Sequence, residues 1–337
     1  MTDARTQTRF GPREILFLAA AAYCLTGFAE WNPWATAPIA LAIGIALALL
    51  GLTAFEPESK RLSRILIQAS VVLLGFSISL SDVARAGLPG MVFAAATIAL
   101  VFVLGFALRR LLATDRQVSS LLTAGTAICG GSAIAATGTV IGASSASISV
   151  ATAVVFLLNA GGVYAYPLIG RALDLSQAQF GAWAAVGIHD VAGVVAAAKQ
   201  YGDAALAEAT VIKLTRVLWI VPVAVVLGRM AQAGTAAGGA SAKRPAAPIP
   251  WFVALFLVAC AARTAAQWAL GEGEVAPVAA HLKDIAKAAM TLALFLIGTG
   301  LSRSALRQAG WRPLLQGLLM WIAVSIAALA AVRAMVP

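Results

Sequence analysis

Runs of about 20 apolar residues recur along the whole chain, the length that an α-helix needs to cross a bilayer. Hydrophobic residues make up 61% of the 337 residues and charged residues only 11%. A soluble domain carries roughly a quarter charged residues, so these residues are too few for a water-facing surface. Alternating ten-residue strands are missing from the sequence, which argues against an outer-membrane barrel. The sequence therefore predicts an all-α polytopic membrane protein.

The apolar runs predict about eleven transmembrane helices in a single transmembrane domain, residues 1–337. The first run follows basic residues but has no small-residue cleavage site, so we expect it to be retained as a span. Residues 231–249 are rich in Ala, Gly and Pro and predict a cytoplasmic linker between spans 8 and 9. The predicted spans are 14–30, 36–55, 63–80, 89–109, 118–141, 147–170, 178–198, 205–229, 250–270, 285–301 and 313–335.

The distribution of Lys and Arg predicts the orientation of these spans. The chain has a net charge of +10, which the excess of basic residues in cytoplasmic loops explains without nucleic-acid binding. Eleven spans place the termini on opposite sides, and a cytoplasmic N-terminus puts sixteen basic residues inside against five outside. The inside set is Arg5, Arg9, Arg13, Lys60, Arg61, Arg64, Arg109, Arg110, Arg116, Arg171, Arg229, Lys243, Arg244, Arg303, Arg307 and Arg312. The outside set is Arg85, Lys199, Lys283, Lys287 and Arg333.

Two segments with similar sequences suggest an internal repeat. "LLGFSISLSDVARAG" (73–87) and "LFLIGTGLSRSALRQAG" (294–310) both run from an apolar helix through "LS" to a polar turn that ends in "AG". They follow spans 3 and 10, which would cross in opposite directions, as in the inverted repeats of secondary transporters. Chance similarity between two hairpins of this composition is the alternative.

Four ionisable residues fall deep inside predicted spans. His189 and Asp190 lie midway along span 7, and Lys213 and Arg216 lie near the middle of span 8. Each charge at this depth costs several kcal/mol unless it is paired or hydrated (about 2.5–3.5 kcal/mol on insertion scales). Lys213 and Arg216 are three residues apart, so they share one helix face.

A purely structural explanation is an ion pair between Asp190 and one of the two cations. This pairing leaves one positive charge over, which a transported anion would neutralise, so we expect a polar site at these residues. Arg263 lies nearer the outer end of span 9 and is expected to reach the headgroups. His281 falls in an outer loop and is expected to be solvated.

Glycines predict two broken helices near these charges. Gly130 and Gly131 can unwind span 5, and Gly193 can do the same in span 7. A helix that restarts after such a break directs free N–H groups and its positive dipole end into the gap, where Ser132 could cap it or bind a ligand. The alternative is that small residues only allow close helix packing. Cys129 is expected to be a small apolar filler at the break.

Three motifs resemble a known family. "GTAICGGSAIAA" (125–136), "GIHDVAGVVAAA" (187–198) and "ATVIKLTRVLWIVP" (209–222), with "GWRPLLQGLLMW" (310–321) near the end, are similar to the YeiH-like sulfate exporter family of bacterial inner-membrane proteins. The resemblance covers nearly the whole chain. It implies a secondary transporter in the bacterial inner membrane, with paired broken helices like those of the cation–proton antiporter and bile-acid symporter folds.

These features together predict an exporter of a small anion such as sulfate that works by alternating access and is coupled to protons. Gly130, Gly131, Ser132, Gly193, Lys213 and Arg216 are the predicted substrate-binding residues, and His189 and Asp190 the predicted coupling residues. The alternative is a cation/proton antiporter that uses Asp190 and Lys213.

Other classes of protein fit less well. GxSxG and HExxH signatures are missing from the sequence, so we do not expect an enzyme. A receptor or scaffold would need more chain outside the bilayer. We expect no cofactor, no metal and no nucleic-acid partner; the predicted partners are the small anion and the lipid bilayer, with a homo-oligomer left open.

Overall fold

The computed structural model describes residues 11–26, 32, 35–233, 251–301, 307 and 309–335, and every regular element in these ranges is a helix. In chain order the helices are α1 (Pro12–Leu25), α2 (Ala37–Leu50), α3 (Glu56–Gly75), α4 (Leu80–Leu112), α5 (Arg116–Ala127), α6 (Gly131–Ile141), α7 (Ser145–Ala172), α8 (Gln177–Gly187), α9 (Val191–Tyr201), α10 (Asp203–Leu218), α11 (Ile220–Ala233), α12 (Trp251–Leu270), α13 (Glu272–Thr299) and α15 (Trp311–Met335). The predicted all-α class is confirmed.

Each predicted span overlaps one helix or two consecutive helices. Within the described ranges, four helical stretches are long and apolar enough to cross a membrane: Gly90–Leu112, Ser145–Ala172, Asp203–Met230 and Trp311–Met335. Several other helices are apolar but shorter. The helices therefore agree with a membrane protein, and the count of eleven crossings stays a prediction. The predicted linker lies outside the described residues from position 234 onward.

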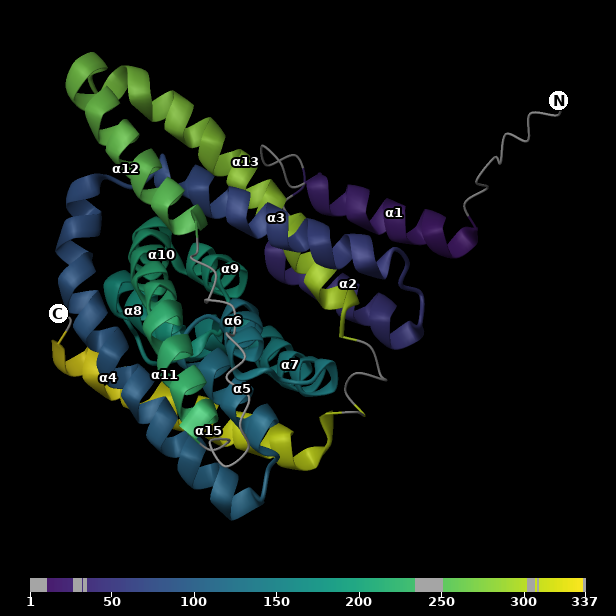
Figure 1. Ribbon diagram of the computed structural model, residues 1–337. Helices are drawn as coiled ribbons and strands as arrows, with labels where there is room; N and C mark the ends of the chain where they lie inside the picture. Colours follow the sequence, from purple (N-terminus) through teal and green to yellow (C-terminus); the bar gives the residue numbers. More distant parts are fainter. Residues whose placement is uncertain are drawn as a thin grey trace, which may run out of the picture.

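The helices form two groups (Figure 1). In the first group, α13 packs along α2 and α3, with α1 and α12 beside them. The second group contains α4 to α11 and α15, and α10 packs against α4, α8 and α9 near its centre. The predicted repeat involves α3 and α13, which pack against each other. Part of its second segment lies outside the described residues, so the repeat stays a prediction.

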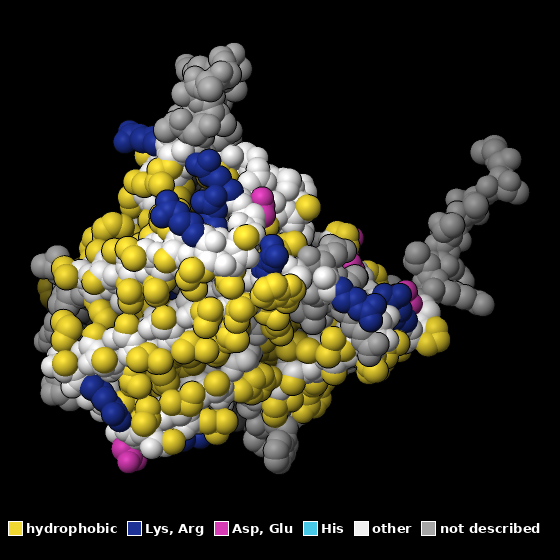
Figure 2. All heavy atoms as spheres, turned by 90° about the horizontal axis from the view of Figure 1, so that it is seen from below, with side chains coloured by type: hydrophobic (Ala, Val, Ile, Leu, Met, Phe, Trp, Pro, Cys, Tyr) yellow, Lys and Arg dark blue, Asp and Glu magenta, His cyan; other side chains and the backbone are white. Residues whose placement is uncertain are grey.

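The surface of the molecule is apolar over a wide area. Figure 2 shows hydrophobic side chains across most of one face, with Lys and Arg gathered in a few small groups. Large side chains such as Leu111 and Trp268 are 79% and 86% exposed. An apolar surface of this extent is unfavourable in water and suits contact with lipid.

Predicted spans 5 and 7 are interrupted near the middle of the second group, whereas span 8 is divided only at Trp219, between α10 and α11. The first interruption separates α5 from α6, where Gly130 has a φ of +65° that a residue with a side chain adopts only under strain. The second separates α8 from α9 at residues 188–190, three to five positions before the glycine that we expected to cause it. Asp190 accounts for the difference, because its side chain caps the first turn of α9 and so restarts the helix there.

Candidate functional site

The two buried cations of α10 each contact one of the interrupted helices. Lys213 is fully buried, and its Nζ donates hydrogen bonds to the carbonyl oxygens of Ala185 (3.2 Å) and Ile188 (2.7 Å) at the end of α8. The last carbonyls of a helix have no partner within the helix and carry its negative dipole end. Lys213 therefore satisfies and neutralises the C-terminal end of α8.

Arg216 does the same for the other interrupted helix, one turn further along α10. It is also fully buried, and its guanidinium donates to the carbonyl of Ala127, the last residue of α5. A second N–H donates to Thr97 Oγ1 on α4 at 2.7 Å. The spacing that places both cations on one helix face thus places one at each break. The sequence predicted the shared face but not these carbonyl partners.

Asp190 caps α9 and makes no ion pair with either cation. Its Oδ1 accepts the N–H of Gly193 at 2.6 Å, and its Oδ2 accepts the side-chain amide of Asn159 on α7 at 2.6 Å. The Asn159 carbonyl oxygen accepts the backbone N–H of Asp190, so the two side chains hold each other. Among the described residues, the ion pairs within 4.0 Å do not join Asp190 to Lys213 or Arg216. The purely structural alternative, an ion pair between Asp190 and one of the two cations, is therefore wrong.

Asn159 is a member of this site that the sequence reasoning missed. It is 1% exposed and lies in the middle of α7. The signal was available, because asparagine occurs only twice in the chain and this one falls inside an apolar span. Its amide also explains Gly193: a Cβ at this position would lie 2.8 Å from Asn159 Oδ1 and Nδ2. Gly193 therefore allows the Asn159 side chain of α7 to lie close to the backbone of α9, and it does not break the helix.

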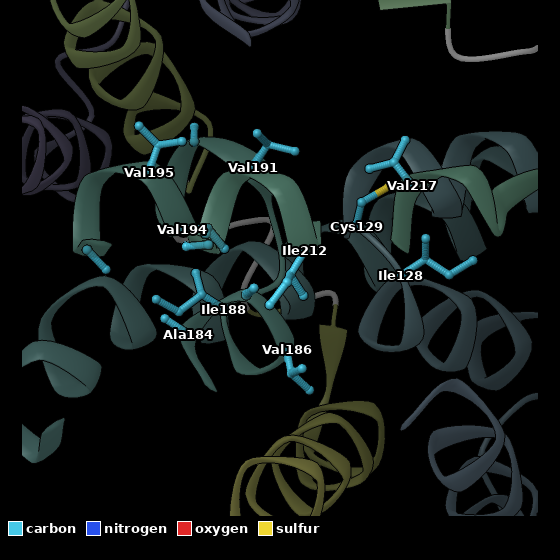
Figure 3. Packing of buried hydrophobic residues seen from close by; sticks show 14 of the residues in the cluster. Ile128, Cys129, Ala184, Val186, Ile188, Val191, Val194, Val195, Ile212 and Val217 are labelled. Atoms are coloured by element: carbon cyan, nitrogen blue, oxygen red, sulfur yellow. The ribbon is translucent and has the colours of Figure 1, made fainter. Parts of the chain in front are cut away.

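The N-terminal end of α6 has no side-chain cap, unlike that of α9. Gly130 precedes the helix and has no side chain that could cap it, and Gly131 begins the helix. Ser132 is exposed. The Cys129 thiol lies against the N–H of Ala133, but sulfur is a weak acceptor. Figure 3 shows Cys129 beside Val217 of α10, among the buried hydrophobic side chains. Its packing agrees with the predicted apolar filler, although it also contacts the helix end.

His189 lies beside this uncapped end. It is 1% exposed, and within the described part of the chain neither of its ring nitrogens has a hydrogen-bond partner. A Cβ at Gly130 would lie 3.6 Å from the His189 Cβ, so the two interruptions meet at these residues. The Arg216 Nε is also buried without a partner, and so is the hydroxyl of Thr126 in the last turn of α5. Unsatisfied polar groups at this depth are costly and mark a place where a ligand can bind.

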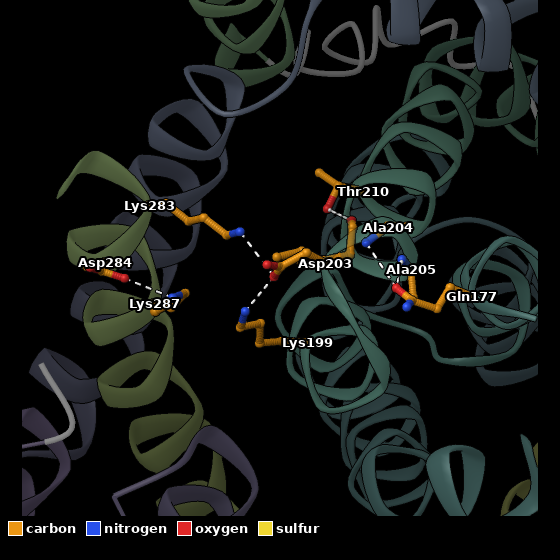
Figure 4. Close-up of polar contacts among 10 residues, drawn as sticks. Gln177, Lys199, Asp203, Ala204, Ala205, Thr210, Lys283, Asp284 and Lys287 are labelled. Carbon is orange, nitrogen blue, oxygen red and sulfur yellow. Dashed lines mark hydrogen bonds and ion pairs between the residues drawn. The ribbon is translucent and has the colours of Figure 1, made fainter. Parts of the chain in front are cut away.

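Other charged residues lie away from the breaks. Arg263 on α12 bonds to Gln267 and to Glu272 of α13, and its side chain is only 13% exposed, so its predicted reach to the headgroups stays a prediction. His281 is exposed, as predicted, but it lies within α13 and not in a loop. Asp203, at the start of α10, pairs with Lys199 and with Lys283 of α13, as Figure 4 shows. The latter ion pair joins the two helix groups.

Comparisons with known proteins agree with a membrane protein. A family model described as conserved hypothetical protein 698 matches residues 14–317. UPF0324 membrane proteins of Bacteroides thetaiotaomicron and Porphyromonas gingivalis are 39% and 40% identical over 307 and 304 residues. These alignments cover 91% and 90% of this chain and 89% and 88% of the relatives.

A UPF0324 membrane protein of Geobacter sulfurreducens is 39% identical over 306 residues, which cover 90% of this chain and 92% of the relative. No solved structure matches the chain. The match to the family model extends over most of the chain and includes both interruptions and α10. The chain therefore belongs to the membrane protein family described as conserved hypothetical protein 698.

Proposed function

We propose that the protein is a secondary active transporter that exports a small anion across the bacterial inner membrane by alternating access. The observation that carries the proposal is the meeting of two interrupted helices at buried, unpaired polar groups. Non-helical backbone at membrane depth is tolerated where it is buried in protein or lines a polar cavity, and transporters place their binding sites at such breaks. Sulfate is the candidate anion that the sequence resemblance names.

The charges favour an anion over a cation. In the described chain, the acidic and basic side chains buried at the breaks are those of Asp190, Lys213 and Arg216. One negative and two positive charges leave a net charge of one positive. The α6 end adds free N–H groups and a positive dipole end, while Lys213 and Arg216 already cover the carbonyls that a cation would need. Both Asp190 oxygens also accept hydrogen bonds from the protein. An anion therefore fits better than the alternative, a cation exchanged at Asp190.

In this proposal, the imidazole of His189 and the carboxylic acid of Asp190, beside the α6 end, couple transport to protons. No enzymatic reaction and no cofactor is needed for this function. Gly130, Gly131 and Ser132 would offer backbone and hydroxyl donors to the anion, and the two cations would attract it at longer range.

The test is anion flux into proteoliposomes that contain the purified protein. Sulfate, sulfite, thiosulfate and small carboxylates are screened with and without a pH gradient. We expect at least one anion to move and Lys213→Ala and Arg216→Ala to slow it, with Arg110→Ala on the exposed end of α4 as control. Parent-like flux in both site variants would show that the site is elsewhere.

Asp190→Asn separates the two candidate functions. The asparagine keeps an oxygen for the Gly193 N–H, so α9 stays capped. Anion exchange down a gradient should continue in this variant, whereas a cation/proton antiporter would lose its ion-binding carboxylate and stop. Loss of all exchange, together with cation movement by the parent protein, would favour the antiporter.

A further inference from the structure

The polar groups at the breaks also restrict the kind of anion. The inference rests on the proposed function and concerns the same site. It starts from the three buried charges: both oxygens of Asp190 accept N–H groups, as an ionised carboxylate does, and the two cations then leave a single positive charge in excess. Uncompensated charge in a low-dielectric interior is unfavourable, so a ligand with one negative charge balances the site. A dianion would leave the opposite charge in excess.

His189 supplies the second restriction. His189 is 1% exposed and no described side chain accepts a hydrogen bond from its ring, so a second ring proton would be a buried charge without a partner, and the neutral imidazole is favoured. A neutral imidazole has one N–H donor and one nitrogen acceptor, and in the described chain both are without partners. A ligand that satisfies both must itself offer an acceptor and a donor.

The remaining unpaired groups have the same requirement. The Arg216 Nε can only donate, the Thr126 hydroxyl can donate or accept, and the first N–H groups of α6 donate. Most groups around the ligand therefore need acceptor oxygens, and the acceptor nitrogen of His189 needs one O–H. Sulfate and nitrate have only acceptors at neutral pH.

We propose that the site binds a small monovalent oxyanion that still carries a proton, of the hydrogencarbonate or hydrogensulfite type. The single charge matches the charge excess at the breaks, the oxygens accept from α6 and Arg216, and the O–H donates to His189.

Equilibrium binding to the purified full-length protein in detergent micelles tests the proposal, with three probes of fixed character at one pH and ionic strength. Hydrogencarbonate has one charge and an O–H, nitrate has one charge and no O–H, and sulfate has two charges and no O–H. We expect hydrogencarbonate to bind about tenfold more tightly than nitrate and more tightly still than sulfate, because an unpaired buried acceptor is costly.

Variants at position 189 test whether His189 is the group that accepts the O–H of the ligand. His189→Gln keeps a donor and an acceptor and should preserve the preference. His189→Leu should weaken hydrogencarbonate binding more than nitrate binding and so remove most of the roughly tenfold preference, because nitrate loses only the N–H donor. The ratio of two affinities in one variant does not depend on the fraction of folded protein. His281→Gln, at the exposed second histidine, is the matched control.

Three results would overturn the proposal: sulfate binding as tightly as hydrogencarbonate, an equal loss of all three probes in His189→Leu, or no binding of any probe. If one of these occurs while an anion is still transported into proteoliposomes, the inference fails and the proposed function stands. If no anion is transported either, both fail.

Discussion

The interruptions α5–α6 and α8–α9 are alike at one end and different at the other. The C-terminal ends of α5 and α8 each receive hydrogen bonds from one cation of α10. The N-terminal end of α9 is closed by Asp190, which Asn159 holds in place, whereas the N-terminal end of α6 has only Gly130 before it. The helix that restarts after the break is thus capped by a side chain at α9 and has no side-chain cap at α6. We therefore expect the proposed ligand to bind at the open end of α6, with α9 as a fixed wall of its site.

The largest expected effect comes from removing a cation, which breaks the feature that the two interruptions share. Arg216→Met should leave the carbonyl of Ala127 buried without a donor and lower the free energy of unfolding by about 3 kcal/mol or more. Lys213→Met should do the same at α8. Thermal unfolding in detergent micelles measures the loss, with the exposed Arg110→Met as control.

Hydrogen exchange tells the two cation variants apart. Arg216→Met should speed exchange of amides at the end of α5 and spare those at the end of α8, and Lys213→Met should show the reverse. Equal exchange at both breaks in both variants would contradict the assignment of one cation to each helix end.

The next effect comes from opening the closed end of α9. Asp190→Ala removes the cap from the Gly193 N–H and leaves the Asn159 amide unpaired, so α9 comes to resemble α6. Loss of a cap and of a buried hydrogen bond together lower stability by about 2–3 kcal/mol. Asp190→Asn should recover only the part that the cap contributes, because its carbonyl oxygen can still accept the Gly193 N–H while its NH2 group faces the donor of Asn159. Equal unfolding temperatures for the alanine and asparagine variants would show that charge, not capping, stabilises this break.

Much of this comparison could be predicted from single residues. Glycines inside an apolar run predicted the first interruption, because Gly130 adopts a backbone conformation with positive φ. Ionisable residues at membrane depth predicted which helices meet, because each must find a partner. The three-residue spacing of Lys213 and Arg216 correctly placed both on one face of α10.

What could not be predicted depends on contacts between distant segments. A sequence pattern does not reveal that Lys213 and Arg216 donate to helix-end carbonyls, since any helix end can serve as partner. The second break was assigned to Gly193 because glycine is the usual helix breaker, but a capping aspartate restarts a helix equally well. The rare asparagine inside an apolar span marked Asn159, but its partner, 31 positions away in the chain, could not be predicted.

A smaller effect is expected from adding a side chain at the open end. Gly130→Ala places a Cβ 3.2 Å from Val155 Cγ1 and forces a φ of +65°, which costs about 1–2 kcal/mol. Gly161→Ala is the matched control, because a Cβ there meets nothing within 4 Å and φ is not positive. The control should be neutral or slightly more stable in thermal unfolding. Equal stability of the two alanine variants would show that the break does not need glycine.

The smallest effect concerns the C-terminal end of α9, where the chain continues into α10. Asp203 joins this corner to α13 through Lys283 at 3.0 Å, but its side chain is 63% exposed. Exposed ion pairs contribute about 0.2–1 kcal/mol, because water screens the charges and two long side chains lose freedom. Asp203→Asn should therefore lower stability by less than about 1 kcal/mol, far below the loss in Asp190→Ala.

A double-mutant cycle between Asp203→Asn and Lys283→Met measures the coupling across the two helix groups, and Asp284→Asn, whose partner Lys287 lies on the same helix, is the control. A coupling energy well above the roughly 0.2–1 kcal/mol typical of exposed ion pairs (about 2 kcal/mol, for example) would show that α9 is held at both ends, at one end by its cap and at the other by α13. A coupling within that range leaves the cap at Asp190 as the contact that holds α9, and the contrast with the open end of α6 then depends on that one carboxylate.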